Sequence, residues 1–158
     1  FPVAMHNLIS KGFYEILQTL VLNQGVPILG ICLGFQLFFK CSLEKSKTSG
    51  LNYFDSEVSK FNENLNESFY IPHVGFNSVE IESGSKLFYG VKPESDFYFT
   101  HSYRILPFET DILFHTSFHG EKFISAVEHK NIFGTQFHPE KSQSNGLKIL
   151  KNFIDIQC

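Results

Sequence analysis

Cysteine is scarce in this sequence. The 158 residues include only three, Cys32, Cys41 and Cys158. A disulfide framework in a chain of this size needs a denser and even set of cysteines, so the count argues against one. The count favours a reducing compartment instead, and we expect the protein to be cytoplasmic.

Long apolar runs and clusters of positive charge are also missing. The longest hydrophobic stretches are much too short to cross a bilayer, and no signal-peptide pattern opens the chain. The formal net charge is −3, with no basic cluster, so we expect no membrane or nucleic-acid partner. No residues have metal-ligand spacing and no glycine-rich phosphate loop is present, so we expect no metal and no organic cofactor.

Tryptophan is absent, whereas phenylalanine is abundant. The chain has 19 phenylalanines and is 42% hydrophobic, which is enough to fill a sizeable core. No internal repeat, low-complexity tract or linker interrupts it. We therefore expect residues 1–158 to form a single domain.

The spacing of apolar residues predicts an α/β fold. Helical spacing covers residues 3–23, restarts at 35–39 and closes the chain at 144–156, whereas residues 44–52 and 62–68 read as polar loops. Strands are predicted at residues 26–31, 57–61, 77–81, 96–103, 112–118, 123–129 and 132–137. This order predicts a three-layer sandwich around a mixed, mostly parallel sheet, with a buried strand that ends at Cys32. Active sites of open α/β sheets lie at that edge.

Cys32 stands between two glycines at the end of this strand. Gly30-Ile31-Cys32-Leu33-Gly34 fits a nucleophile elbow in which cysteine replaces serine. A strand that turns sharply into a helix strains its middle residue and leaves little room beside it, which favours glycine. The N-terminus of the following helix should favour the thiolate. The same five residues also fit a buried structural cysteine.

His138 is the preferred partner for this thiol. It follows a predicted strand, as Cys32 does, so both could meet at one sheet edge, and Glu140 lies two residues on, where it could orient the imidazole. His101 is the rival base, but no carboxylate follows it, so we place it in the substrate pocket. His73 lacks an orienting carboxylate as well, which favours a place at the pocket rim.

Several segments together resemble the class I, or triad, glutamine amidotransferases. The segment at 27–36 reads PILGICLGFQ and resembles the nucleophile block of that family, and the segment at 136–142 reads QFHPEKS and resembles its His/Glu block. With PHVGFN at 72–77 and FYFTHSY at 97–103, the chain is similar to the glutaminase subunits of imidazole glycerol phosphate synthases. The resemblance runs over nearly the whole chain.

This resemblance implies a glutaminase that passes ammonia to a partner (β/α)₈-barrel synthase subunit. It implies a catalytic triad of Cys32, His138 and Glu140, with glutamine as substrate. By resemblance, the substrate contacts would come from Leu33, Gly34, Gln36, His101, Ser102 and Tyr103. The barrel subunit would face Pro72, His73, Asn77, Tyr98 and Lys141.

The chain departs from the family pattern at two places. Val74 and Phe76 stand where the synthase subunits usually have Met and Trp. The chain also opens at Phe1, in residues that resemble those just after the family's Pro-Gly-x-Gly oxyanion loop, so by resemblance the sheet is N-terminally incomplete. Losing one oxyanion donor typically costs ~10²–10³ in rate, and lost strands expose a sheet edge. We expect the chain alone to be poorly active and poorly soluble.

Other functions stay open at this point. A paralogous subunit could supply ammonia for amidino sugars of surface polysaccharide instead of for histidine biosynthesis. A non-catalytic docking subunit could keep the same fold. A cysteine hydrolase of the α/β-hydrolase type is disfavoured, because in that fold the acid precedes the histidine.

Overall fold

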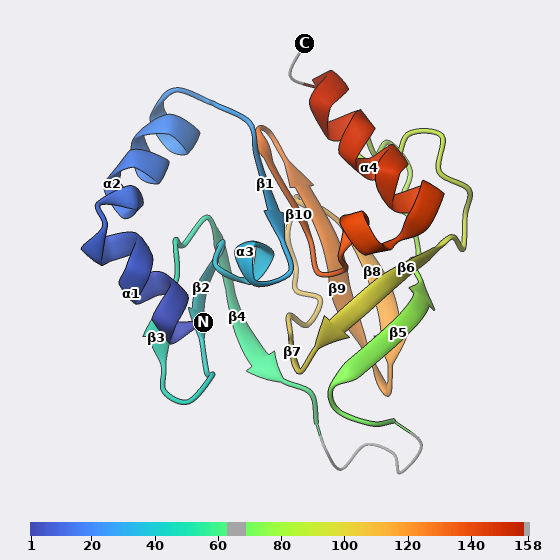
Figure 1. Cartoon of the computed structure of the whole chain (residues 1–158), viewed down its shortest axis with the longest axis horizontal. Coiled ribbons are helices and arrows are strands. Elements are labelled where there is room, and N and C mark those ends of the chain that lie inside the picture. Colours follow the sequence, from blue (N-terminus) through green and yellow to red (C-terminus); the bar gives the residue numbers. More distant parts are fainter. Residues whose placement is uncertain (63–68, 157–158) are drawn as a thin grey trace.

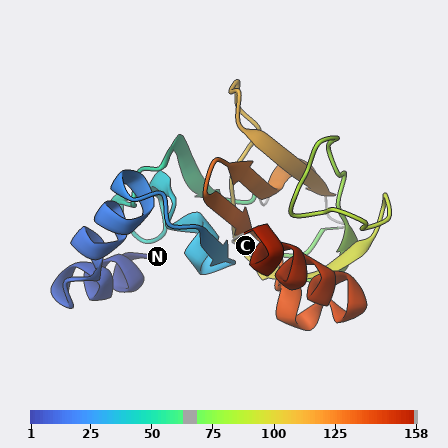
Figure 2. The same ribbon diagram turned by 90° about the horizontal axis from the view of Figure 1, so that it is seen from above.

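The computed structural model describes residues 1–62 and 69–156 and shows helices on both sides of a central sheet (Figure 1). Helices α1 (Pro2–Ser10) and α2 (Phe13–Leu17), with a π-helical turn over Gln18–Asn23, lie on one side of strands β1 and β10. Helix α4 (Gln143–Ile156) lies on the other side, as Figure 2 also shows. The prediction of an α/β fold is confirmed.

The central sheet has the order β1-β10-β9-β8. It consists of β1 (Ile28–Ile31), β10 (Ile132–Thr135), β9 (Glu121–His129) and β8 (Leu113–His119). Strands β1 and β10 are parallel, whereas β10 and β8 both run antiparallel to β9. The sheet is thus mixed, as predicted. It is not mostly parallel, because the chain reverses tightly before and after β9 and so pairs β9 antiparallel with both of its neighbours.

Two smaller sheets complete the strands. One has the order β3-β2-β4-β7 and consists of β3 (Thr48–Ser49), β2 (Phe39–Ser42), β4 (Phe54–Lys60) and β7 (Tyr103–Arg104). The other is the antiparallel pair of β5 (His73–Ser78) and β6 (Asp96–His101). A four-residue helix α3 (Leu33–Gln36) follows β1 directly, and a 3₁₀ turn at Pro139–Lys141 leads into α4.

A hydrophobic core lies on each face of the central sheet, because side chains point alternately to the two faces along a strand. A bulge shifts this alternation on β9, where Ser125 is the extra residue between Ile124, which pairs with Thr116, and Ala126, which pairs with His115. On β9, Ile124 and Val127 join the core under α1, whereas Phe123 and Ala126 join the core under α4. The abundant phenylalanines fill both cores, as the composition predicted. The fully buried ones include Phe35, Phe38, Phe39, Phe54, Phe97, Phe99, Phe123, Phe133 and Phe137.

Several predicted boundaries are wrong. The helix expected over 3–23 breaks at Gly12, whose φ of 74° is the left-handed conformation that ends α1. The helix expected over 35–39 ends at Gln36, and Phe39 already begins β2. The strand expected over 77–81 lies earlier, as β5, and the loop expected over 44–52 contains the short strand β3. Most of the loop expected over 62–68, and Cys158, lie outside the described residues.

Candidate active site

Cys32 occupies a strained turn between β1 and α3. Its φ of 50° and ψ of −104° are unusual for a residue with a side chain. A strained backbone at this position is what the nucleophile elbow predicts. The parallel pairing of Ile31 with Thr135 brings this turn beside the end of β10, where the Cys32 N–H donates to the Thr135 carbonyl at 2.7 Å. The sheet itself therefore joins the cysteine block to the histidine block.

The two flanking glycines have different roles. A Cβ atom on Gly30 would lie 2.6 Å from the ring of Phe38 and 2.8 Å from the carbonyl carbon of Gly34, so only glycine fits at position 30. A Cβ atom on Gly34 would have no described heavy atom within 4 Å. The predicted steric reason for glycine is therefore confirmed at Gly30 and wrong at Gly34, which borders open space.

The charge state of Cys32 reflects opposing effects. Burial raises the pKa of its thiol above the ordinary value, and the Glu140 carboxylate adds to the rise. The Leu33 N–H, the Gln136 side chain and the positive charge of Lys141 lower this pKa, but by less. The Leu33 N–H at the helix terminus therefore favours the thiolate, as predicted, but its effect is smaller than that of burial. Desolvation is the larger effect, and α3 has only four residues.

His138 and Glu140 form the predicted pair. His138 Nδ1 donates to Glu140 Oε1 at 2.6 Å, and the His138 N–H is held by the Tyr98 carbonyl at 2.8 Å. The other ring nitrogen, Nε2, is buried and has no hydrogen-bond partner among the described residues. This geometry fixes the tautomer and leaves Nε2 as the atom that can take or give a proton.

His101 cannot serve as the rival base. Its Nδ1 donates to the Tyr103 carbonyl at 2.8 Å, so its Nε2 is an acceptor, and this receives the Nδ1–H of His73 at 3.0 Å. Both nitrogens of His101 are thus engaged, and burial lowers its pKa to about 4. His101 still lies near the thiol, because the neighbouring Thr100 carbonyl is 3.9 Å from Cys32 Sγ.

His73, which the resemblance places toward the barrel subunit, points into the protein in this chain by itself. Its ring is buried, stacks on His119 at 4.0 Å between ring centroids, and accepts from the Asn77 amide at 3.3 Å. Burial, together with His101 and His119, lowers the pKa of His73 to about 3. The alternation of β5 turns Val74 and Phe76 outward instead, and they are 56% and 50% exposed.

The predicted substrate contacts include groups that already bond to one another. Gln36 is buried, and its Nε2 donates to the Tyr103 carbonyl at 3.1 Å and to Gln136 Oε1 at 2.9 Å. The Ser102 carbonyl accepts from the Phe61 N–H. Gln136, which the sequence analysis did not select, donates to Cys32 Sγ at 3.7 Å. A polar residue at the end of a buried strand, two positions before His138, was the signal for it.

The remaining predicted partner residues lie together beside β5 and β6. Lys141 Nζ lies 5.7 Å from the centre of the Tyr98 ring, and Phe76 packs edge-on against the same ring at 5.5 Å. Asn77 also donates to the Phe118 carbonyl at 2.9 Å, and Pro72 is exposed just before β5. The side chains of Phe76, Tyr98 and Lys141 form an aromatic and basic surface next to His138, whereas Asn77 points to the opposite face of β5, toward His73.

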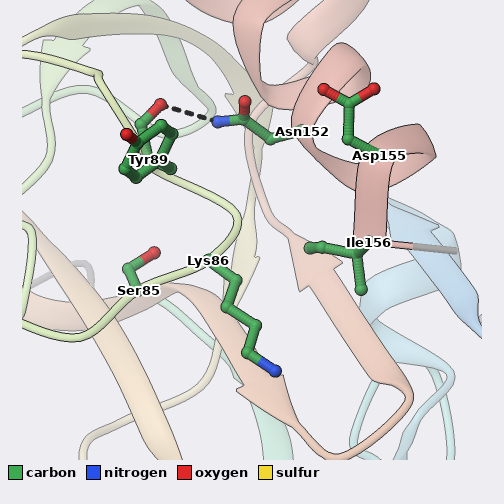
Figure 3. Close-up of a pocket in the computed structure, with 6 residues that line it drawn as sticks. All are labelled: Ser85, Lys86, Tyr89, Asn152, Asp155 and Ile156. Atoms are coloured by element: carbon green, nitrogen blue, oxygen red, sulfur yellow. Dashed lines mark hydrogen bonds between the residues drawn. The ribbon is translucent and has the colours of Figure 1, made fainter. Parts of the chain in front are cut away.

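A pocket lies away from these residues, between α4 and the loop at 85–89 (Figure 3). It has a volume of about 370 Å³ and is lined by Ser85, Lys86, Tyr89, Asn152, Asp155 and Ile156. Asn152 spans it by donating to the carbonyls of Leu87 and Tyr89. Its lining contains none of the predicted site residues, and the amide of Asn152 ties α4 to the loop.

Metal and membrane features are absent from residues 1–62 and 69–156. This part of the chain contains no group of three or more His, Cys, Asp or Glu side chains placed to hold a metal ion. None of its helices is long and apolar enough to cross a membrane.

Comparison with known proteins identifies the family. The model of the family "Glutamine amidotransferase class-I" matches residues 10–156. The chain is 46% identical over 154 residues to imidazole glycerol phosphate synthase subunit HisH 1 of Campylobacter jejuni (strain RM1221), covering 98% of this chain and 75% of the relative. It is 41% identical over 146 residues to subunit HisH of Pelagibacter ubique (strain HTCC1062), covering 92% and 70%.

Solved structures agree with this at the level of the fold. A crystal structure of a glutamine amidotransferase has a TM-score of 0.65 at 13% identity, covering 95% of this chain and 70% of that one. A second, from Thermotoga maritima, has a TM-score of 0.57 at 19% identity, covering 92% and 54%. The chain belongs to the class I glutamine amidotransferase family and, within it, to the group of imidazole glycerol phosphate synthase HisH subunits.

Proposed function

We propose that this chain is the glutaminase subunit of a two-subunit enzyme and that it releases ammonia from the side chain of glutamine. The observation that carries the proposal is the meeting of the strained Cys32 turn with the His138–Glu140 pair, through parallel strands β1 and β10. A nucleophile, a base with one free nitrogen and a carboxylate that orients the base are the parts that acyl transfer requires.

The chemistry runs in two halves. The thiol proton of Cys32 passes to His138 Nε2 as sulfur attacks the amide carbon of glutamine. The C–N bond then breaks, and His138 returns the proton to the leaving ammonia, which leaves a glutamyl thioester. Water, deprotonated by His138, next attacks the thioester, and glutamate departs as the proton returns to sulfur. Glu140 stabilises the imidazolium that forms in each half.

The negative oxygen that forms in each half needs donors. The Leu33 N–H points toward the Cys32 side chain and is the donor that the elbow provides. Because burial raises the pKa of Cys32, the thiol is protonated at rest, so proton transfer to His138 accompanies attack.

The partner is proposed to be a (β/α)₈-barrel synthase subunit that uses the ammonia to make imidazole glycerol phosphate and AICAR in histidine biosynthesis. The names of the HisH relatives support this acceptor over an amidino sugar. The surface of Tyr98, Lys141 and Phe76 next to His138 supports docking at the side where ammonia would leave. The free thiols of Cys32 and Cys41 support a cytoplasmic location.

Ammonia release from glutamine tests the proposal. The chain would be assayed with and without the barrel subunit, beside Cys32→Ala and a Cys41→Ala control. We expect release that depends on the barrel, is lost in Cys32→Ala and persists in Cys41→Ala. Partner binding without release in any combination would show a non-catalytic docking subunit, and release that survives Cys32→Ala would exclude the proposed nucleophile.

A further inference from the structure

A chain of buried amide groups connects the Tyr103 carbonyl to the thiol of Cys32. Gln36 donates to the Tyr103 carbonyl at 3.1 Å and to Gln136 at 2.9 Å, and Gln136 donates to Cys32 Sγ at 3.7 Å. Gln136 is fully buried, and Gln36 is 6% exposed. Residues separated by about a hundred positions thus form one polar network inside the protein.

The Tyr103 carbonyl sets the direction of every bond in this network. A carbonyl oxygen can only accept, so Gln36 must present its NH₂ group to it. The His101 Nδ1–H donates to the same oxygen at 2.8 Å, which agrees with this direction. The second N–H of Gln36 then requires an acceptor, so Gln136 presents its oxygen to Gln36 and its NH₂ group to the sulfur.

We propose that Gln136 is a positioning residue that donates a hydrogen bond to the Cys32 sulfur and is itself oriented by Gln36 and the Tyr103 carbonyl. A donor aimed at sulfur stabilises the negative charge that sulfur carries after its proton leaves and when the thioester breaks. The bond also holds the side chain of Cys32 in place on its strained turn. This inference rests on the proposed role of Cys32 as the nucleophile.

The direction of the charge effects agrees with this role. Gln136 is one of the groups that lower the pKa of Cys32, against the larger rise caused by burial. The charged groups that also act on this sulfur are Glu140, which raises the pKa, and Lys141, which lowers it. Both belong to the 3₁₀ turn after His138, so they are unchanged by substitutions at positions 36 and 136.

The pH profile of Cys32 alkylation by iodoacetamide tests the proposal without any need for glutaminase activity. Peptide mass spectrometry reads Cys32 separately, with Cys41 as the internal reference. In Gln136→Met, which keeps the length of the side chain and removes the donor, we expect the midpoint to rise by about one pH unit. The rate at pH 7 should fall roughly tenfold, as expected for one hydrogen bond to a charged group.

A second variant tests the orientation step. Gln36→Met leaves Gln136 present but frees it to turn, so we expect a shift of the same sign, and the double variant should shift no further than Gln136→Met alone. Gln18→Met is the matched control, since Gln18 donates to the Leu51 carbonyl in a different part of the chain. It should leave the Cys32 profile unchanged.

The outcomes separate the two proposals. An unchanged Cys32 profile in folded Gln136→Met would overturn the positioning role, and Gln136→Leu takes its place if that variant does not fold. An unchanged profile in folded Gln36→Met would overturn the orientation by Gln36. Shifted profiles in a chain that never releases ammonia would support the positioning role and reject the proposed function. Additive shifts in the double variant would overturn the orientation by Gln36.

Discussion

His138 donates to Glu140 at 2.6 Å through Nδ1, and within the described residues its buried Nε2 has no hydrogen-bond partner. The side chain of Glu140 is 47% exposed, whereas that of His138 is 18% exposed. The carboxylate therefore lies at the surface, and Nε2 faces the interior. If His138 is the proposed base, its proton-accepting nitrogen is shielded from bulk water.

We expect Glu140→Gln to lower ammonia release, in the presence of the barrel subunit, by roughly 10²–10⁴-fold with little change in folding. An amide can donate to Nδ1, which would stabilise the wrong tautomer and leave a proton on Nε2. The measurement is kcat for ammonia release. Glu15→Gln, at an exposed position of α2, is the control. A kcat within about threefold of the parent protein would contradict the orienting role of Glu140.

We expect Gly30→Ala to destabilise the protein, whereas Gly34→Ala should not. The new methyl group at position 30 would contact the Phe38 ring and the Gly34 backbone at under 3 Å, and overpacking of this kind typically costs about 1–3 kcal/mol. At position 34 the space is open, and alanine improves helix propensity by up to ~1 kcal/mol. Urea denaturation of both variants gives the two free energies of unfolding. Equal losses would contradict this assignment.

We expect the protein to lose stability as the pH falls below about 6.5, the ordinary pKa of histidine. His73 and His101 stay neutral in the folded state, with pKa values of about 3 and about 4, but take up protons when the chain unfolds. As the pH falls, the unfolded state therefore takes up protons before the folded state does. Each of the two histidines should lower the free energy of unfolding by roughly 1 kcal/mol per pH unit, until the pH approaches the pKa of that histidine in the folded state.

Denaturation midpoints between pH 7.5 and 5 measure this effect. His73→Gln and His101→Gln should each show a shallower fall than the parent protein over that range. His6→Gln, at an exposed position of α1, should keep the full slope. Parallel slopes in all four proteins would show that other groups cause the loss.

We expect Phe76→Ala to weaken binding of the barrel subunit by at least ~10-fold without lowering stability. Half of the Phe76 side chain is exposed, and it packs against Tyr98, so it would become buried only in the complex. Isothermal titration calorimetry gives the Kd. Tyr89→Ala is the control, because Tyr89 is 78% exposed and lies beside α4, where its carbonyl accepts from Asn152. Equal effects of the two substitutions would place the interface elsewhere.

The local geometry of the candidate site was largely predictable from the sequence. Glycine spacing indicated the strained turn at Cys32, and the spacing of His138 and Glu140 indicated their hydrogen bond. These features are local, since each depends on residues within a few positions of one another. Helix and strand boundaries were less predictable: Gly12 ends a helix within a continuous apolar pattern, and Phe39 begins a strand within helical spacing.

Only the tertiary structure decided how distant segments combine. The sequence by itself indicated the turn at Cys32 and the pairing of His138 with Glu140, but the register of β1 on β10 decided that these two segments end at the same edge of the sheet. The inward turn of His73, the engagement of both His101 nitrogens and the aim of Gln136 at sulfur all depend on contacts across long stretches of chain. The periodicity of a sequence shows which face of a helix or strand is buried. Only the packing of the elements decides which side chains from other parts of the chain contact that face.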